Sequence, residues 1–406
     1  MAVRILVTDG ENRSALAVTR SLGTRGCQVL VTHSCKQSLA SSSRHCWQSF
    51  QTPDPVLQGP EYSQSIMDLV RGYDIDFIFP ITDASIYWLN KVRDILPKSS
   101  TLACPSNDLF EVVSNKSKLC QLAQRCSVCV PGTIYLSSRN DLPECIDKIT
   151  TYPVVIKPAM SKVLEKGQLL SGCVRYASSP AELEELYTTY EVLKHPSMIQ
   201  EKVVGPGTAI FTLFDGNEHL ALFSHQRILE KPPSGGVSVL SQSVPLDQEM
   251  VDSAARLLKT VGWQGIAMVE FKRDLRDGKP RLMEINGRFW GSLQLAIACG
   301  VDFPVLYLDY LSGRDVQCSR KDYIVGHKLR WSLGMFDHLL IRLRHNDMRL
   351  KLPGNVPSLF QVLKELCNVF DRQTSEDVFD RTDVRPQLVE AYVYLCHIIG
   401  SKGSSS

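Results

Sequence analysis

The chain has 406 residues, which is enough for two or three domains with a sizeable core. Its formal net charge of +2 and its 22% charged residues are ordinary for a globular protein, so they indicate neither a nucleic-acid-binding surface nor a polybasic membrane surface. No run approaches the roughly 18 apolar residues that span a bilayer, and the N-terminus lacks the pattern of a secretion signal. We therefore expect a cytoplasmic protein with 13 reduced cysteines and with no nucleic-acid or membrane partner.

Residues 1–110 alternate short apolar runs with amphipathic stretches, a pattern that is typical of a parallel α/β sheet. The expected elements are strand 3–8, helix 15–22, strand 27–32, a polar loop 34–43, helix 63–71, strand 77–80, helix 85–95 and strand 101–103. The turn after the first strand reads DGENRS and not G-x-G-x-x-G, so a dinucleotide fingerprint is absent. The sequence therefore predicts a doubly wound domain with another ligand site or a purely structural role.

Residues 111–196 are expected to form a second unit, and the helix predicted at 108–125 carries Lys116 into it. The apolar strand 152–158 ends in Lys157. Taken alone, such a lysine is best explained by an ammonium group that extends to the surface; the alternative is that it faces an anion. The loop 159–172 could close over phosphates, but it contains only two glycines. The other expected elements are strand 133–136 and helices 141–149 and 181–193.

Residues 197–335 are expected to form a third unit, made mainly of antiparallel strands. His225 and Arg227 precede the loop 230–238, EKPPSGGVS, and are either substrate contacts or ordinary strand residues. The expected elements are strand 198–204, the hairpin 209–214/219–223, helix 247–261, an apolar helical stretch at 293–311 broken near Gly300 and Pro304, and strand 325–333.

A second hairpin is predicted at 265–291, with strands at 266–271 and 281–286. Because strand side chains alternate, Leu282, Glu284 and Asn286 are expected to share one face, and strand pairing can bring Glu270 beside them. Three oxygen ligands without a thiolate or imidazole suit Mg²⁺ better than Zn²⁺, and Mg²⁺ held by few carboxylates usually shares nucleotide phosphates. The alternative from the hairpin alone is a solvated strand face.

Residues 336–406 are expected to be a helical extension that ends in a frayed tail, SKGSSS. Helices are predicted at 338–345 and 358–370.

Five motifs together make residues 1–330 resemble the ATP-grasp superfamily. They are SNKSKLCQLAQRCSVCVPGT, YPVVIKPA, MIQEKVVG, GWQGIAMVEF and LMEINGRFWGS. Each motif is weak alone, and their order and spacing carry the resemblance. It is closest to the carboxylate–amine ligases, with biotin carboxylase and the large chain of carbamoyl phosphate synthetase as more distant relatives. It implies an α/β (α+β) fold, in which an N-terminal Rossmann-like domain precedes the ATP-grasp unit and a helical extension follows.

The resemblance implies a site for ATP and one or two Mg²⁺ ions. Lys116 and Lys157 would contact the α and β phosphates. Glu270, Glu284 and Asn286 would hold the metal. The hinge would be formed by Gln200, Glu201, Lys202, Val203 and Val204. Its backbone would bind the adenine edge, and the side chains of Glu201 and Lys202 would add contacts.

The resemblance also implies catalytic roles. Arg288 would stabilise an acyl phosphate and a tetrahedral intermediate, and Lys157 and Arg227 are the other catalytic candidates. Phe289 and Trp290 would help to exclude water.

Three features depart from the pattern of the superfamily. No carboxylate follows the hinge at Gly205-Pro206-Gly207-Thr208, so the ribose must be held otherwise. The loop after Lys157 is poor in glycine, which argues against the chemistry of biotin carboxylase. Gly287 stands where proline often follows the metal-binding asparagine.

The resemblance thus implies a ligase that activates a small carboxylate, such as that of an amino acid, and couples it to an amine. The alternatives are an ATP-grasp enzyme with a thiol acceptor or a phosphorylated product, and a non-catalytic ATP-binding protein. A homodimer is expected only by analogy.

Overall fold

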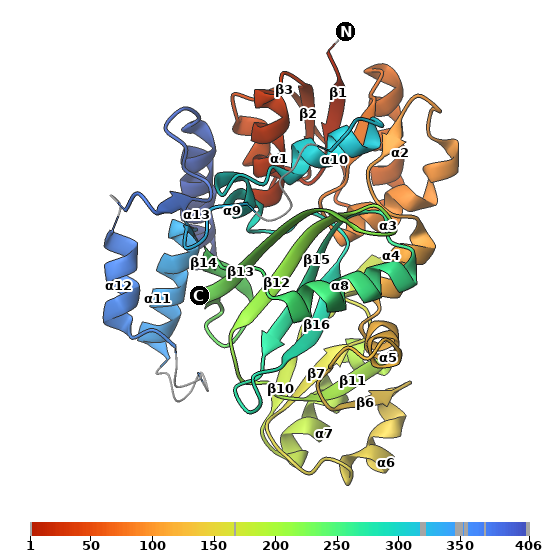
Figure 1. The fold of residues 1–406 in the computed structure, drawn as a ribbon, viewed down its shortest axis with the longest axis vertical. Helices are drawn as coiled ribbons and strands as arrows, with labels where there is room; N and C mark the ends of the chain where they lie inside the picture. The colour runs from red at the N-terminus through yellow and green to blue at the C-terminus, as the bar shows by residue number, and fades with distance from the viewer. Residues whose placement is uncertain are drawn as a thin grey trace.

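The structure is a computed structural model, and it describes residues 2–165, 168–316, 322–345, 352, 356–368 and 371–402. Three sheets organise the chain, and Figure 1 shows them one above another, with the C-terminal helices along one side. Within the described residues, no helix has both the length and the apolar character needed to cross a bilayer.

The first sheet is parallel and has the strand order β3-β2-β1-β4-β5. Its strands are β1 (Arg4–Val7), β2 (Gln28–His33), β3 (Cys46–Gln51), β4 (Phe77–Phe79) and β5 (Thr101–Leu102), and its helices are α1 (Arg13–Thr24), α2 (Gly59–Gly72) and α3 (Asp83–Lys91). The central strands are continuous apolar runs because helices cover both faces of the sheet. The sequence does not predict β3, an edge strand whose residues alternate between half-buried and exposed.

The predicted helix 108–125 is two helices, α4 (Asn107–Ser114) and α5 (Lys116–Arg125). Asn115 separates them because its backbone is extended, with φ −82° and ψ 101°, and its side chain accepts a hydrogen bond from the Lys118 N–H. An asparagine that caps a helix in this way starts a new one. The break places Lys116 at the first position of α5.

The second sheet is antiparallel and has the order β10-β7-β11-β6. Its elements are β6 (Thr133–Leu136), α6 (Leu142–Ile146), β7 (Val154–Pro158), β10 (Arg175–Ala177), α7 (Pro180–Thr189) and β11 (Ser197–Glu201). A separate hairpin, β8 (Lys162–Glu165) with β9 (Gln168–Ser171), forms in the stretch expected to be a loop. The expected boundary between 196 and 197 differs from this topology, because β11 pairs with β6 and β7 inside the second sheet.

The third sheet has seven strands in the order β16-β15-β12-β13-β14-β17-β18. The strands are β12 (Gly207–Phe214), β13 (His219–Lys231), β14 (Val237–Ser243), β15 (Gly265–Arg273), β16 (Pro280–Asn286), β17 (Lys328–Arg330) and β18 (Thr374–Glu376). The helix α8 (Gln248–Val261) packs its apolar side on one face, where Leu257 and Leu258 meet Val269 and Phe271. Long runs of alternating side chains allow the sheet to bury both faces.

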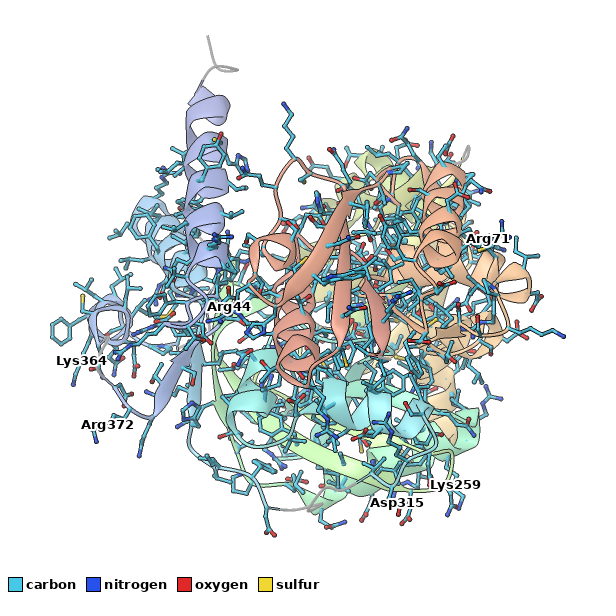
Figure 2. All side chains as sticks on the ribbon, turned by 90° about the horizontal axis from the view of Figure 1, so that it is seen from above. Arg44, Arg71, Lys259, Asp315, Lys364 and Arg372 are labelled. Atoms are coloured by element: carbon cyan, nitrogen blue, oxygen red, sulfur yellow. The ribbon has the colours of Figure 1, made fainter. Side chains whose placement is uncertain are left out.

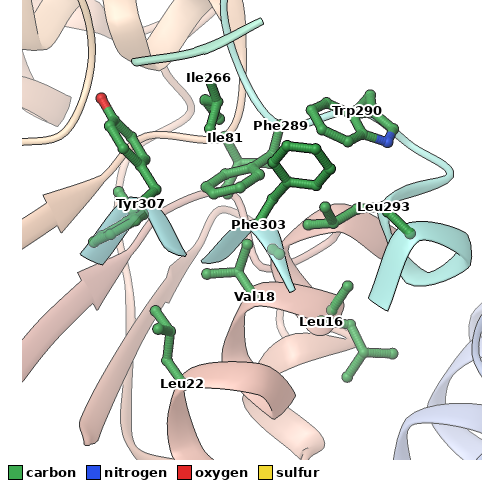
Figure 3. Close-up of a cluster of buried hydrophobic side chains, with 14 of the residues drawn as sticks. Leu16, Val18, Leu22, Ile81, Ile266, Phe289, Trp290, Leu293, Phe303 and Tyr307 are labelled. Atoms are coloured by element: carbon green, nitrogen blue, oxygen red, sulfur yellow. The ribbon is translucent and has the colours of Figure 1, made fainter. Parts of the chain in front are cut away.

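The opposite face of the third sheet packs against the N-terminal domain through α9 (Leu293–Ala298) and α10 (Phe303–Leu311). Figure 3 shows this core, in which Phe289 and Trp290 lie near Phe303 and the α1 residues Leu16 and Val18. The break predicted near Gly300 separates the two helices. The first and third sheets are therefore joined by one apolar core.

The C-terminal extension contains α11 (Ser332–Arg344), α12 (Leu359–Cys367) and α13 (Arg385–Lys402). The sequence predicts a wholly helical extension, and this prediction is wrong, because the extension also contains the strand β18, which pairs in parallel with β17. Asp383, just before α13, accepts a hydrogen bond from Arg20 Nε at 2.9 Å and one from the Arg44 N–H at 2.9 Å. Figure 2 shows Arg44 where the N-terminal domain faces this extension. The predicted tail 401–406 lies mostly outside the described residues.

Four short 3-10 helices complete the described elements: Ala40–Ser42, Arg93–Ile95, Arg139–Asp141 and Glu191–Lys194.

Candidate active site

The β15–β16 hairpin brings together the oxygen ligands that the alternation pattern predicts. Glu270 lies directly opposite Glu284, and Met268 lies opposite Asn286. Directly opposed residues of an antiparallel pair have Cβ atoms about 4.5–5.5 Å apart. The Asn286 amide donates to Glu284 Oε1 at 2.9 Å, so the second strand contributes two coupled polar side chains.

A β-bulge changes the rest of that face. The register shifts between Glu270 and Phe271, so Leu282 lies opposite Phe271 and Met283 is the additional residue. Leu282 is buried in the core beneath α8, and the expectation that it shares a face with Glu284 is wrong. The bulge therefore leaves Glu284 opposite Glu270 while it places Leu282 opposite Phe271 in the core.

Arg227 forms an ion pair with Glu270. Its guanidinium donates to Glu270 Oε2 and, at 3.0 Å, to Glu230 Oε1. The side chain passes across β12 near Gly207, where a Cβ would lie 3.6 Å from Arg227 Cδ. Burial tends to lower the pKa of Arg227, but Glu270 and Glu230 outweigh this effect and raise it. The arginine is therefore the fixed counter-ion of one predicted metal ligand.

His225 is a core residue and not an open substrate contact. It is 1% exposed, its Nε2 lies 2.7 Å from Ser292 Oγ, and its ring lies 4.6 Å from that of Phe211. Burial and the nearby Arg227 lower the pKa of His225 to about 3, so the ring is neutral at physiological pH.

The two predicted phosphate-binding lysines meet near Glu284. Lys116 Nζ lies 2.5 Å from Ser161 Oγ and 3.9 Å from Glu284 Oε2. Burial lowers the pKa of Lys157, Glu284 opposes this shift, and Lys116 adds to it. Burial tends to raise the pKa of Glu284, but Lys116, the Asn286 amide and Lys157 lower it to about 2. This carboxylate is therefore ionised at neutral pH.

The side chains that open the predicted hinge are engaged within the protein. The Gln200 amide donates to Thr133 Oγ1 at 2.9 Å. Glu201 accepts from the Gly132 N–H at 2.9 Å and pairs with Arg276 at 2.9 Å, and Arg276 lowers its pKa. Both side chains join β11 to its surroundings, which leaves ligand contacts at these positions to the backbone.

The rest of the hinge lies at the wall of a large cleft. Lys202 Nζ lies 5.6 Å from the centre of the Tyr176 ring, which belongs to the second sheet. Val203 is buried, Val204 is 40% exposed, and the Val204 carbonyl accepts from the Leu275 N–H at 2.9 Å. An apolar wall of this kind suits a flat heterocycle.

This central cleft has a volume of about 740 Å³ and lies between the second and third sheets. Pockets that hold small molecules have volumes of about 300–1,000 Å³. Its walls include five charged residues described above and the five residues of the hinge, namely Lys116, Lys157, Arg227, Glu270 and Glu284 together with Gln200, Glu201, Lys202, Val203 and Val204. His338, Val356 and Pro357 of the extension also line it. Asn286 lines a smaller neighbouring cavity, which meets the cleft at Lys116 and Glu284.

Arg288 is held between the two domains. Its Nε donates to Asp83 Oδ1 at 2.7 Å, and its Nη2 lies 3.4 Å from Asn286 Oδ1. Asp83 is a functional candidate that the sequence reasoning missed, although it follows the carboxyl end of β4, where parallel sheets place ligand-binding residues. Phe289 and Trp290, expected to shield the site from water, are at most 2% exposed and pack in the core between domains.

The switch point of the parallel sheet, between β1 and β4, is filled by the chain itself. Asp9 has a left-handed backbone, with φ 56°, and its buried carboxylate accepts from Ser85 Oγ at 2.7 Å and from the Thr82 N–H at 3.2 Å. It also accepts from Thr8 Oγ1 at 2.5 Å. The N-terminus of α3 therefore binds an internal carboxylate, which favours the structural alternative for this end of the domain.

The predicted metal ligands are two carboxylates and one amide. Within the described residues, no group of three or more His, Cys, Asp and Glu side chains is arranged to hold a metal ion. A site with only two carboxylates suits Mg²⁺ that takes its remaining ligands from phosphates and water. Glu270 and Glu284 carry Arg227 and Lys116 as counter-ions, so a divalent cation would find two carboxylates side by side. Burial raises the pKa of Glu270 although Arg227 opposes this shift, whereas Glu284 is ionised at neutral pH.

Several solved structures share this architecture. Biotin carboxylase from Campylobacter jejuni, in a β,γ-ATP complex, aligns over 80% of this chain and 74% of its own with a TM-score of 0.64 and 17% identity. L-Amino acid ligase from Bacillus licheniformis aligns over 75% and 73% with a TM-score of 0.58 and 17% identity. The biotin carboxylase domain of Hydrogenobacter thermophilus 2-oxoglutarate carboxylase, solved with MgADP, ADP and bicarbonate, aligns over 81% and 74% with a TM-score of 0.62 and 16% identity.

The chain is therefore an ATP-grasp protein by fold, and the resemblance seen in the sequence is confirmed. Within that class, residues 222–331 match the family model described as ATP-grasp in the biosynthetic pathway with Ter operon. The matched segment runs from β13 to just beyond β17 and contains Glu270, Glu284, Asn286 and Arg288. No curated protein matches the chain.

Proposed function

We propose that the protein is an ATP-dependent ligase that activates a small carboxylate as an acyl phosphate and couples it to an amine. One observation carries the proposal: Lys116, Lys157, Glu270 and Glu284 all line a cleft of about 740 Å³ that the hinge lines as well. The fold supports the proposal, because its neighbours include an amino acid ligase and two biotin carboxylases.

The residues of the cleft have separate tasks in this reaction. Lys116 and Lys157 bind the α and β phosphates of ATP, and the backbone at Lys202–Val204 binds the adenine. Fixed charges in a partly buried site stabilise phosphate without reorganising, because water competes weakly there. The ribose is held without a carboxylate after the hinge, where Gly205-Pro206-Gly207 stands.

Glu270, Glu284 and Asn286 would hold Mg²⁺, one or two ions. Bound there, the metal would offset charge on the β and γ phosphates during transfer. Arg227 holds the Glu270 carboxylate in place, and Asn286 orients that of Glu284. These contacts fix the ligands before the nucleotide binds, which lowers the ordering cost of binding.

The reaction then proceeds in two displacements. The substrate carboxylate attacks the γ phosphorus, the bond to the β,γ-bridging oxygen breaks, and an acyl phosphate and ADP form. The amine attacks the activated carbonyl, loses a proton, and expels phosphate. Arg288, oriented by Asp83, stabilises the negative oxygen that develops in the second step.

Amine-dependent ADP release tests the proposal, with Glu284→Gln as the decisive variant. We expect release to fall by about a hundred- to thousandfold, because charge stabilisation in the transition state is lost. The exposed Glu185→Gln serves as the matched control and should leave the rate unchanged. Unchanged turnover in Glu284→Gln would overturn the assignment.

The product separates the proposal from its alternatives. Mass spectrometry should find an amide. A thioester or a stable phosphorylated compound would keep the ATP site and replace the acceptor chemistry. Tight ATP binding with no product across a broad panel of carboxylates and amines would instead indicate a non-catalytic protein.

A further inference from the structure

A second cavity lies beside the central cleft and has a different character. This side cavity has a volume of about 80 Å³ and shares only Lys116 and Glu284 with the lining of the central cleft. Its walls come from α3, α4, the β8–β9 hairpin and the end of β16. It therefore meets the central cleft at one proposed phosphate-binding residue and one proposed metal ligand.

The side cavity is lined by both charged and apolar side chains. Its charged residues include Asp83, Lys116 and Glu284, of which Lys116 and Glu284 also line the central cleft. Its apolar part includes Phe110 and Leu169, which are 6% and 5% exposed. A ligand that matches this lining has a charged head and a short apolar tail.

The β8–β9 hairpin closes the apolar part over the N-terminal domain. The Leu169 N–H donates to the Val56 carbonyl at 3.2 Å, which fixes this strand against the N-terminal domain. Leu164, on the partner strand, also lines the cavity and is 46% exposed, so the wall reaches solvent there. A small molecule has a route of entry beside the hairpin.

The volume of the cavity limits the tail of the ligand. An apolar cavity of about 150 Å³ accommodates benzene. Because Lys116 and Glu284 also line the central cleft, the charged head of the ligand can lie where the two spaces meet, and only its tail has to fit the side cavity. A space of about 80 Å³ suits a branched group of roughly three or four carbons and excludes an aromatic ring.

The charges beside the cavity match those of an α-amino acid. The Arg288 guanidinium, which contacts Asp83 and Asn286 of the cavity lining, can receive a carboxylate. Asp83 binds Arg288 through Oδ1, and its carboxylate can also receive an ammonium group. The substrate carboxylate then lies between the predicted metal ligands and Arg288, where it is to be phosphorylated.

We propose that the side cavity selects the carboxylate substrate and that this substrate is an amino acid with an aliphatic side chain of three or four carbons, the size of valine or leucine. This inference rests on the proposed ligase function. The amine substrate approaches from elsewhere, because the cavity is too small for both.

The test uses ADP release with the full-length protein, one fixed amine, and alanine, valine, leucine or phenylalanine as the carboxylate substrate. Valine and leucine should have values of kcat/KM about tenfold above those of alanine and phenylalanine, since one or two methylene groups in a shaped pocket give discrimination of this size. The preference should reside mainly in KM.

Three variants locate the preference in the cavity. Leu169→Ala enlarges the cavity and should raise kcat/KM for phenylalanine about tenfold relative to leucine; Leu169→Phe fills it and should lower kcat/KM for leucine about tenfold while sparing alanine. Leu170→Ala is the matched control, because the neighbouring side chain of β9 does not line the cavity. ATP affinity, measured by isothermal titration calorimetry, should be the same in all three.

The possible failures are distinguishable. If ADP release depends on an amino acid but its size preference is the same in all variants, the cavity assignment is overturned and the ligase proposal stands. If no amino acid stimulates ADP release, saturation-transfer NMR with valine decides. Binding that Leu169→Phe abolishes would keep the cavity and overturn the ligase chemistry, and no binding would overturn both.

Discussion

Two regions of this protein bury carboxylates, and they balance the charge in opposite ways. At the switch point of the parallel sheet, Asp9 is surrounded by hydroxyl and backbone N–H groups of its own domain. At the β15–β16 hairpin, Glu270 and Glu284 are balanced by the cations Arg227 and Lys116. Burial raises the pKa of Asp9 and, although Arg227 opposes the shift, also that of Glu270, whereas the nearby cations hold the pKa of Glu284 at about 2.

The difference separates a structural carboxylate from a functional one. Neutral donors that point at Asp9 satisfy its carboxylate, and a ligand would have to break five hydrogen bonds to replace it. The ion pairs at the hairpin can be exchanged. A divalent cation can replace the lysine as the partner of the carboxylate, and a phosphate can replace the carboxylate as the partner of the lysine. Four predictions test this contrast.

The largest effect is expected from Arg227→Met, which leaves Glu270 buried without its counter-ion. Breaking such a pair destabilises a protein by about 3–5 kcal/mol, because the remaining charge stays desolvated. Urea unfolding measures the loss. The double variant Arg227→Met/Glu270→Gln should recover most of it, and a double variant as unstable as the single one would show that Arg227 stabilises the fold by packing instead.

A smaller loss of stability, about 2 kcal/mol, is expected from Asp9→Asn. The NH₂ of the new amide would face donors from which the carboxylate accepted hydrogen bonds. Asparagine tolerates the left-handed backbone of Asp9, so the change tests the hydrogen bonds alone. ATP affinity by isothermal titration calorimetry should change less than twofold. Loss of ATP binding with unchanged stability would place the parallel sheet in the active site and break the contrast.

The pH dependence of stability should differ between the wild type and Glu284→Gln. The pKa of Glu284 is lowered from 4.5 to about 2, so its contribution is fully present above pH 4.5 and is lost as the pH falls towards 2. About a third of the side chain is exposed, at 34%, so solvent screening limits the effect to about 1–2 kcal/mol. Urea unfolding at pH 5 and pH 3 should show a larger loss in the wild type than in the variant. Equal losses would mean that Lys116 and Lys157 do not lower this pKa.

The smallest effect is expected from Asn115→Ala, which removes the cap that starts α5 at Lys116. The loss of a helix cap destabilises by about 1 kcal/mol. KM for ATP should rise about threefold to tenfold, because the backbone that positions Lys116 at the start of α5 is held less firmly. The value of kcat should stay close to that of the wild type. Ser106→Ala, at the start of α4, is the matched control, since Ser106 makes no cap hydrogen bond with its side chain. An equal rise in KM in both variants would assign the effect to the α4–α5 pair as a whole.

The hairpin shows how much of the site the sequence predicts. Alternation along two short strands is a local pattern, and it correctly brought Glu270, Glu284 and Asn286 together. The bulge at Met283 was not predictable in this way, because it depends on how one strand pairs with the other. Leu282 therefore faces the core and not the ligands.

The partners of the cations lie beyond the reach of local patterns. Arg227 reaches Glu270 across an intervening strand, and Arg288 meets Asp83 from another domain, 205 residues away. Both pairs depend on how separate elements pack. The strands β3 and β18 were missed for a related reason, since an edge strand has only one covered side and a weak apolar pattern.

The order in which the sheets can form follows from β18. The parallel sheet uses residues 4–102, so it can assemble early while the ribosome is still making the rest of the chain. The seven-stranded sheet takes strands from Gly207 to Glu376, so its last strand is made long after the parallel sheet. Arg13 and Arg20 of α1 likewise cannot pair with Asp377 and Asp383 until that part of the chain has been made. The helix α1 thus forms with the parallel sheet but reaches its final set of contacts only after β18 has been synthesised.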